Sequence, residues 1–282
     1  MNYHLAMHFK THLLIFSFIC LLLSACQANQ SGTNYERVAV TGASVTCGFG
    51  VSTRPIPGDL GAYPVTMREI FDAMIETPNH QVSFFGDKMF FSRPNSMGKQ
   101  LIVKINEYKP TLVIGIDYLF WFAYGIFSDN TEEARLKRLE EGFNLLASID
   151  AQIIVGDIPN MSQAIGGLLS SSQVPSIETI EKMNLLIEQR ALNYQNLTVV
   201  PLYEIVEKLK ADERIEVMDV FWPAGSQKLL LQQDKLHPTL EGTVAICLFI
   251  AEVLGEEDFM HDPKKIMKIS EQLARIEHSK GN

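Results

Sequence analysis

Three polar side chains in this sequence have the types and spacing of a nucleophile, its base and a carboxylate that orients the base. Ser44 closes the tripeptide Gly42-Ala43-Ser44 at the end of a short apolar run, where a strand is expected to turn into a helix. Asp234 and His237 stand three residues apart, directly before a proline. A serine hydroxyl attacks a carbonyl when a base takes its proton, and a carboxylate on one imidazole nitrogen leaves the other free as that base. The pattern therefore predicts covalent chemistry at Ser44.

Each half of this pattern also has a plain structural interpretation. A serine after a glycine often only caps the next helix, and a loop histidine beside an acid is often simply solvated. Beyond residue 25 the chain has four histidines, and only His237 stands at an expected strand-to-helix junction with a carboxylate at fixed spacing. The sequence has no phosphate-binding loop, dinucleotide fingerprint, Cys-x-x-Cys or His-Glu-x-x-His motif. We therefore expect a serine nucleophile that uses no metal and no organic cofactor.

Three segments resemble the motif blocks of the SGNH (GDSL-type) hydrolases. Residues 42–44 (Gly-Ala-Ser) are similar to the first block, usually Gly-Asp-Ser, and residues 234–238 (Asp-Lys-Leu-His-Pro) to the last. Residues 115–117 (Gly-Ile-Asp) stand where the third block, Gly-x-Asn-Asp, is expected. The resemblance covers about residues 37–256. It implies a flavodoxin-like α/β/α sandwich with a five-stranded parallel sheet, and hydrolysis or transfer of an acyl ester through an acyl-serine.

The residues that would bind the oxyanion depart from the family pattern. The Ser44 amide is expected to donate one hydrogen bond. Asp117 stands in place of the family's donating asparagine, and an ionised carboxylate there would repel an oxyanion; Asp117 could donate only if protonated. Loss of one such donor costs about 10²–10³ in rate. The glycine of the second block is also ambiguous, because Gly86, Asn95 and Gly98 all lie in the right stretch; we carry forward Ser44, Gly98 and Asp117 as the oxyanion candidates.

Alternating apolar and amphipathic segments predict the elements that position these residues. We expect strands at 37–41, 82–85, 88–92, 111–115, 151–155 and 197–201, and helices at 63–75, 97–108, 132–148, 177–193, 238–254 and 263–282. Strands separated by helices predict a parallel sheet covered on both faces, with functional residues at the carboxyl ends of the strands. At that edge, Phe120–Tyr124 is expected to wall a pocket or to pack as an aromatic cluster. Met161–Ser176 is expected to form a lid over an apolar site or an ordinary surface loop.

The first 26 residues read as a targeting signal. Lys10 precedes an 11-residue apolar run, Leu13–Leu23. A helix needs about 20 residues to cross a bilayer, so this run has instead the length of a signal-peptide core. Residues 23–26 (Leu-Ser-Ala-Cys) resemble the bacterial lipobox, which implies cleavage before Cys26 and acylation of that residue; an ordinary signal peptide with an incidental Cys26 is the alternative. Gln27 then favours the outer membrane, with the protein facing the periplasm.

Composition and net charge exclude several classes of protein. The 282 residues are 46% hydrophobic and carry a formal charge of −9, from 24 Lys+Arg and 33 Asp+Glu. These values exclude collagen-like and disordered classes, and the chain lacks the basic stripe of a nucleic-acid binder. A disulfide between Cys47 and Cys247 would be possible in an oxidising periplasm. We expect the two to remain unpaired, because Cys247 lies ten residues beyond His237, about 15 Å along a helix, whereas Cys47 lies three residues after Ser44. We divide the chain into a signal peptide (1–25), a polar tether (26–36), a hydrolase-like domain (37–256) and a C-terminal helical tail (257–282).

The sequence thus predicts a lipid-anchored serine hydrolase of the bacterial cell envelope that cleaves or transfers an acyl ester through an acyl-Ser44 intermediate. The expected substrate is an ester or acylated small molecule, lipid or glycan. The alternative, motivated by Asp117, is a non-catalytic lipoprotein of the same fold that binds an acyl or glycan ligand. Substrate identity and oligomeric state stay open at this point.

Overall fold

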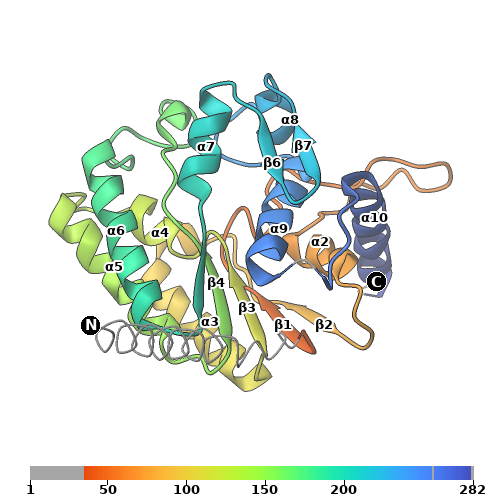
Figure 1. Ribbon diagram of the computed structural model, residues 1–282, viewed down its shortest axis with the longest axis horizontal. Coiled ribbons are helices and arrows are strands. Elements are labelled where there is room, and N and C mark those ends of the chain that lie inside the picture. Colours follow the sequence, from red (N-terminus) through yellow and green to blue (C-terminus); the bar gives the residue numbers. More distant parts are fainter. Residues whose placement is uncertain (1–34, 256, 281–282) are drawn as a thin grey trace, which may run out of the picture. The chain divides into compact units, whose positions relative to one another are not determined.

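Five short apolar segments pair as parallel strands in one sheet (Figure 1). The computed structural model describes residues 35–255 and 257–280, and its sheet has the order β2-β1-β3-β4-β5. The strands are β1 (Arg37–Val40), β2 (Gln81–Phe84), β3 (Leu112–Gly115), β4 (Gln152–Gly156) and β5 (Leu197–Val200). This is the flavodoxin-like strand order. The predicted α/β fold with a five-stranded parallel sheet is therefore confirmed.

Helices cover both faces of the sheet and create two separate cores (Figure 1). One face carries α2 (Met67–Met74), α9 (Leu240–Leu254) and α10 (Pro263–Lys280). The other carries α3 (Pro94–Tyr108), α5 (Glu132–Leu146) and α6 (Ile177–Asn193). Because strand side chains alternate between faces, every second residue of a strand enters each core. With both faces buried, the strands read in the sequence as nearly continuous apolar runs.

The direction of the chain connections reverses between the adjacent strands β1 and β3. β1 leads into α2 on one face, whereas β3 leads into α4 (Phe120–Tyr124) and α5 on the other. Loops that leave neighbouring strands in opposite directions open a crevice at the carboxyl edge of the sheet. Ser44 lies in the loop after β1 and Asp117 in the loop after β3, and both line one cavity.

The structure differs from the predicted elements in two ways: among the described residues one predicted strand is absent, and several short elements were not predicted. Residues 88–92, predicted as a strand, form a turn and the short 3-10 helix η1 (Phe90–Ser92). The Asp87 side chain accepts a hydrogen bond from the Met89 amide at 2.8 Å and closes this turn, so the prediction is wrong here. Several short elements are absent from the prediction: α4, η2 (Ser162–Ala164), α7 (Leu202–Lys210), β6 (Ile215–Val217), β7 (Val220–Trp222) and α8 (Gln227–Leu230).

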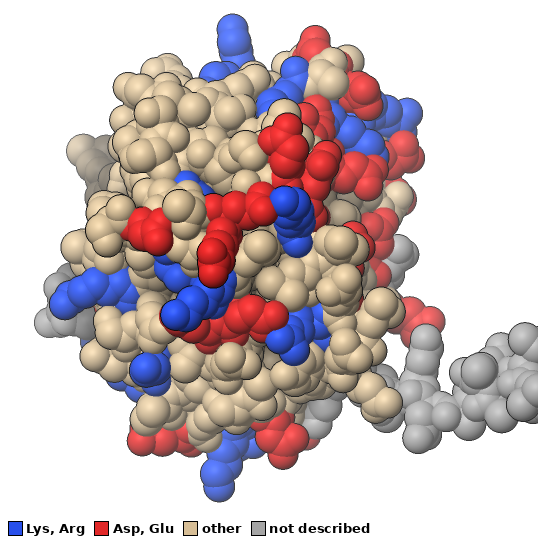
Figure 2. Space-filling model, turned by 90° about the vertical axis from the view of Figure 1, so that its left-hand side faces the viewer, with Lys and Arg blue, Asp and Glu red and all other residues tan. Residues whose placement is uncertain are grey.

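The outer surface of α5 and α6 is charged, and Figure 2 shows acidic and basic side chains interspersed across it. Lys182 Nζ lies 2.6 Å from Glu132 Oε1, and Arg190 pairs with Glu140, so ion pairs join the two helices. Exposed pairs of this kind stabilise a fold only slightly. Their mixed signs give this face no basic field of the type that attracts nucleic acid.

The two ends of the chain differ in what the structure describes. Cys26 and the predicted signal peptide (1–25) lie outside the described residues. At the other end, the predicted tail contains α10, which packs against α2 and α9. Among the described residues, no helix combines the length and the apolar character needed to span a bilayer. Cys47 and Cys247 are both buried free thiols, as expected.

Candidate active site

A tight turn after β1 presents Ser44 at the carboxyl edge of the sheet. Gly42 has a φ of +147°, and a Cβ at this position would lie 1.9 Å from Asp117 Oδ1. Only glycine fits so close an approach of backbone to carboxylate. The Cys47 amide donates to the Ala43 carbonyl at 2.7 Å and closes the turn. The Ser44 side chain is consequently fixed in place and only 8% exposed.

Asp234 and His237 form a hydrogen-bonded pair within one turn. Asp234 Oδ2 lies 2.8 Å from His237 Nδ1, and Asp234 Oδ1 accepts from the amides of Leu236 and His237 at 2.9 Å each. Burial raises the pKa of the Asp234 carboxyl, but hydrogen bonds from the His237 amide, the His237 ring and the Leu236 amide outweigh burial and hold that pKa below its usual value. An ionised Asp234 holds the proton on Nδ1 and leaves Nε2 as the free acceptor.

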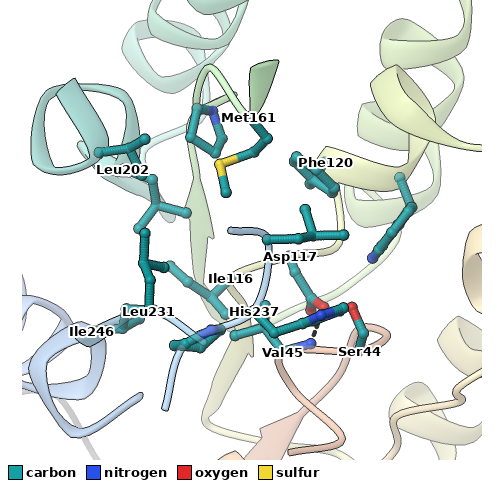
Figure 3. A pocket seen from close by; sticks show the side chains of 15 residues that line it. Ser44, Val45, Ile116, Asp117, Phe120, Met161, Leu202, Leu231, His237 and Ile246 are labelled. Atoms are coloured by element: carbon teal, nitrogen blue, oxygen red, sulfur yellow. Dashed lines mark hydrogen bonds between the residues drawn. The ribbon is translucent and has the colours of Figure 1, made fainter. Parts of the chain in front are cut away.

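The turn of Ser44 and the turn of His237 meet, although the two residues are 193 positions apart in the chain. Both side chains line the same two cavities, and Figure 3 shows them at one end of the first. Ser44 Oγ and His237 Nε2 are buried, and neither has a hydrogen-bond partner among the described residues. No hydrogen bond joins these two atoms to each other. Contacts of this kind are often long in a free enzyme and shorten when substrate binds.

The first cavity is almost entirely apolar. Its polar lining residues are Ser44, Asp117 and His237, and the others are apolar or aromatic. The apolar lining residues come from the loop after β1, from the segments that follow β3, β4 and β5, from the segment before α9 and from α9 itself. Figure 3 labels several of them, among them Val45, Ile116, Met161, Leu202 and Ile246. Such a cavity favours a hydrocarbon group over a sugar.

A second cavity shares Ser44 and His237 with the first. Its lining adds a cation and an amide, Lys88 and Gln173, to exposed apolar side chains such as Met89 and Ile126. Ser44 thus lies where the apolar first cavity meets the more polar second cavity.

Asp117 accepts hydrogen bonds from the turn that contains Ser44, whereas an oxyanion site requires groups that donate them. Its carboxylate accepts hydrogen bonds from the Ala43 amide at 3.2 Å, the Val45 amide at 3.0 Å and Thr46 Oγ1 at 2.6 Å. Burial raises the pKa of the Asp117 carboxyl, and these hydrogen bonds oppose that rise. Because both carboxylate oxygens are used as acceptors, Asp117 holds the turn on both sides of Ser44 and offers an oxyanion no donor. Thr46, which sequence reasoning missed, is part of this network.

The other oxyanion candidates lie in different places. Gly98 is inside α3, where the helix's own hydrogen bonds use its amide, and it lines neither of these cavities. A Cβ on Gly98 would lie 2.7 Å from Tyr118 Oη, so a packing requirement explains this glycine. Gly86, the alternative, follows β2 directly, and a Cβ there would lie 3.1 Å from Thr46 Cγ2 in the turn of Ser44. The structure therefore brings Gly86, not Gly98, next to this turn.

The aromatic segment after Asp117 has both of the roles considered for it. Phe120 and Trp121 line the first cavity, whereas Phe122 and Tyr124 are completely buried in the core. The loop at 161–176 also reaches the site, because Met161 lines the first cavity and Leu168 and Leu169 line the second.

Cys47, three residues after Ser44, does not supply an alternative nucleophile. Burial and the nearby Asp117 charge raise the pKa of its thiol to about 12. A thiol is nucleophilic as the thiolate, so Cys47 is unreactive at neutral pH. It also lines neither of the cavities that contain Ser44.

Comparison with known proteins gives likeness in structure alone. No family model and no curated protein matches the sequence. A gut microbial diltiazem-metabolizing enzyme is similar at 15% identity and a TM-score of 0.52 over 81% of this chain, which spans about half (49%) of that protein. A putative acylhydrolase from Bacteroides fragilis is 16% identical over 83% of this chain and 93% of that one, with a TM-score of 0.44. A catalytic mutant of Axe2, an acetylxylan esterase from Geobacillus stearothermophilus, is 15% identical over 83% and 100%, with a TM-score of 0.46. At these identities the likeness concerns the fold.

Proposed function

We propose that this protein is a serine ester hydrolase of the SGNH type. Ser44 is the nucleophile, His237 is the general base and acid, and Asp234 orients the His237 ring. One observation carries the proposal: the 2.8 Å bond from Asp234 to Nδ1 leaves Nε2 buried and unpartnered, in the same cavities as the unpartnered Ser44 Oγ. Buried polar atoms normally have partners, and atoms without them mark positions where a ligand completes the bonding.

The proposed reaction has two halves. Ser44 Oγ adds to the ester carbonyl while its proton moves to His237 Nε2, and the resulting imidazolium gives that proton to the departing alcohol. Water then attacks the acyl-Ser44 carbonyl, with His237 again as base, and the acid is released. Another alcohol in place of water would make the reaction an acyl transfer. Asp234 stays ionised throughout and stabilises the imidazolium.

The two cavities suggest how an ester would lie. The first cavity suits the acyl group, because its lining beyond Ser44, Asp117 and His237 is apolar or aromatic. The second cavity suits the alcohol, because Lys88 and Gln173 offer polar contacts there. An apolar acyl chain longer than acetyl is therefore the proposed substrate class, since burial of each further CH₂ contributes about 0.8 kcal/mol.

We further propose that the protein is anchored in the bacterial cell envelope through lipid on Cys26. The support for this is the lipobox-like sequence 23–26 after an apolar run of 11 residues. A polar tether would then separate the anchor from the hydrolase-like domain, which faces the periplasm from the outer membrane.

Turnover of p-nitrophenyl esters tests the proposed hydrolysis. Wild type is expected to release p-nitrophenol from the acetate and the octanoate, and Ser44→Ala to lose activity by a factor of about 10⁴ or more. Ser279→Ala, at the exposed end of α10, is the control and should match wild type. Equal turnover by Ser44→Ala and wild type would refute the proposal and favour a non-catalytic ligand-binding protein.

A further inference from the structure

Trp121 carries a buried hydrogen-bond donor that has no acceptor among the described residues. Its side chain is only 5% exposed, and the atom concerned is the indole Nε1. A buried indole N–H usually finds a partner, and it is a donor that cannot act as an acceptor. The atom or group that pairs with it must therefore be an acceptor brought by something that enters the cavity.

The position of Trp121 connects this donor to the candidate active site. Four residues line both cavities: Ser44, Trp121, Leu236 and His237. Three of them carry buried unpartnered polar atoms, Ser44 Oγ, Trp121 Nε1 and His237 Nε2. The other such side-chain atoms in the described part of the chain belong to residues that line neither cavity: Tyr118, Asn130, Arg138 and Arg190. A hydroxyl, an imidazole nitrogen and an N–H donor without partners thus belong to residues that line the same two cavities.

The reaction proposed above needs such a donor. Addition of Ser44 Oγ to an ester moves the carbonyl π electrons onto oxygen, and donors aimed at that oxyanion lower the barrier. The Ser44 amide is free for this, because the described residues offer it no acceptor. Asp117 offers no second donor, since its carboxylate accepts from the turn. Lys88 and Gln173 line only the second cavity, and the Gln173 amide already donates to the Tyr124 carbonyl, whereas Trp121 lines both cavities and has a buried N–H without an acceptor among the described residues.

The indole is held by rigid surroundings. Trp121 lies in α4, whose five residues are all buried. Its ring packs edge-on against Phe120 at 4.9 Å and in a tilted arrangement against Phe91 at 5.7 Å between centroids. The Gly125 amide donates to the Trp121 carbonyl at 3.0 Å and ends the helix. A donor fixed before the reaction costs no reorganisation when charge develops, which is the condition for oxyanion stabilisation.

We propose that Trp121 Nε1–H binds the carbonyl oxygen of the substrate and stabilises the oxyanion formed on it. This rests on the proposed function. As the Oγ–C bond forms, the Ser44 proton passes to His237 Nε2 and the carbonyl oxygen becomes the oxyanion that accepts from the indole. On collapse the C=O bond re-forms, the bond to the alcohol oxygen breaks, and His237 protonates that oxygen. Trp121 keeps its proton throughout.

Kinetics of Trp121→Phe test the assignment. The variant keeps an aromatic ring and lacks the N–H, so kcat is expected to fall by about 10²-fold or more with a nearly unchanged KM. The chain's second tryptophan provides the control: Trp222 Nε1 donates to Glu241 Oε1 at 2.8 Å, and Trp222 lines neither cavity. Trp222→Phe should leave kcat unchanged. Wild-type kcat in Trp121→Phe, alongside loss of turnover in Ser44→Ala, would overturn the assignment and leave the hydrolase proposal intact. Turnover that is independent of Ser44 would overturn both.

An NMR measurement on the wild-type protein tests the same assignment and does not depend on the folding of the Trp121→Phe variant. The chain has two tryptophans, so an amide-nitrogen NMR spectrum has two indole N–H signals, and Trp222→Phe assigns them. Butylboronic acid forms a tetrahedral adduct with a nucleophilic serine and places an oxygen in the oxyanion position. We expect the Trp121 indole proton to shift downfield on its addition, the Trp222 signal to stay, and Ser44→Ala to show no change. An adduct at Ser44 without a shift at Trp121 would contradict the assignment.

Discussion

Asp117 is a buried carboxylate, 4% exposed, whose oxygens accept hydrogen bonds from residues on both sides of Ser44. An asparagine at this position has one acceptor oxygen and brings two donors of its own. The aspartate therefore suits a turn whose amides at Ala43 and Val45 both point at it. We infer that the residue positions Ser44 and has no direct contact with an oxyanion.

Asp117→Asn tests this positioning role. The amide would leave at least one buried N–H or hydroxyl donor of the turn without an acceptor, which costs about 1–3 kcal/mol. Urea unfolding should show a stability lower by that amount, together with reduced turnover. Thr46→Val, which removes one of these donors at similar volume, should cost about 1 kcal/mol. An Asp117→Asn variant that is as stable as wild type and faster would instead show that an asparagine serves as an oxyanion donor here.

At the scale of elements, the sequence predicts the long helices and the strands of the central sheet well. Each of these elements has a regular pattern of apolar residues that can be recognised within its own segment. The buried strands read as apolar runs, and α6 begins and ends at the predicted residues, Ile177 and Asn193. α4 was missed because five consecutive buried residues, Phe120–Tyr124, show no amphipathic period. The segment 88–92 was wrongly read as a strand, because its turn depends on one side chain, Asp87.

The features of the candidate site also divide into those that the sequence predicts and those that depend on how distant segments pack. The Asp234–His237 bond could be expected because the two residues share one turn, and Ser44 could be placed because it ends a strand. A pocket wall at 120–124 is one of the two expectations, but the sequence does not tell which of these side chains would line both cavities, since that depends on how α4 packs against residues such as Phe91. Asp117 could be located from the sequence, but the direction of its hydrogen bonds depends on the fold of another loop.

A substitution in α7 tests the proposal that the first cavity binds the acyl group. Val206 lies on this helix and lines the first cavity, so Val206→Trp fills space there. We expect kcat/KM for p-nitrophenyl octanoate to fall by about tenfold or more relative to the acetate. Ile126→Trp, in the second cavity, is the matched control. It should leave the ratio unchanged, because the two esters share one alcohol. A changed ratio in Ile126→Trp but not in Val206→Trp would place the acyl chain in the second cavity.

At the scale of the whole molecule, the proposed anchor and the proposed catalytic domain are separate features of the chain. Cys26 stands nine positions before Tyr35, the first described residue, and Ser44 lies a further nine positions on. Lipid on Cys26 would determine where the protein resides, whereas the fold from β1 to α10 would determine what it does. The two proposals therefore succeed or fail independently.

Cys26→Ser tests the anchor. When the full chain is expressed in a Gram-negative bacterium with labelled palmitate, wild type should incorporate label and sediment with outer membranes, since two or more acyl chains give stable binding. The variant should do neither. Cys47→Ala, which alters a buried thiol, should behave as wild type does. Unlabelled wild-type protein, released in soluble form, would rule out the lipoprotein assignment.

Covalent labelling of the proposed nucleophile is the most direct measurement of the central claim. A fluorophosphonate probe reacts only with a serine whose hydroxyl is activated by a base, and peptide mass spectrometry identifies the modified residue. We predict a single adduct on Ser44, abolished in Ser44→Ala and strongly slowed in His237→Ala. Absence of any adduct on wild type, or an adduct on a different serine, would contradict the assignment of Ser44 and His237 to one catalytic site.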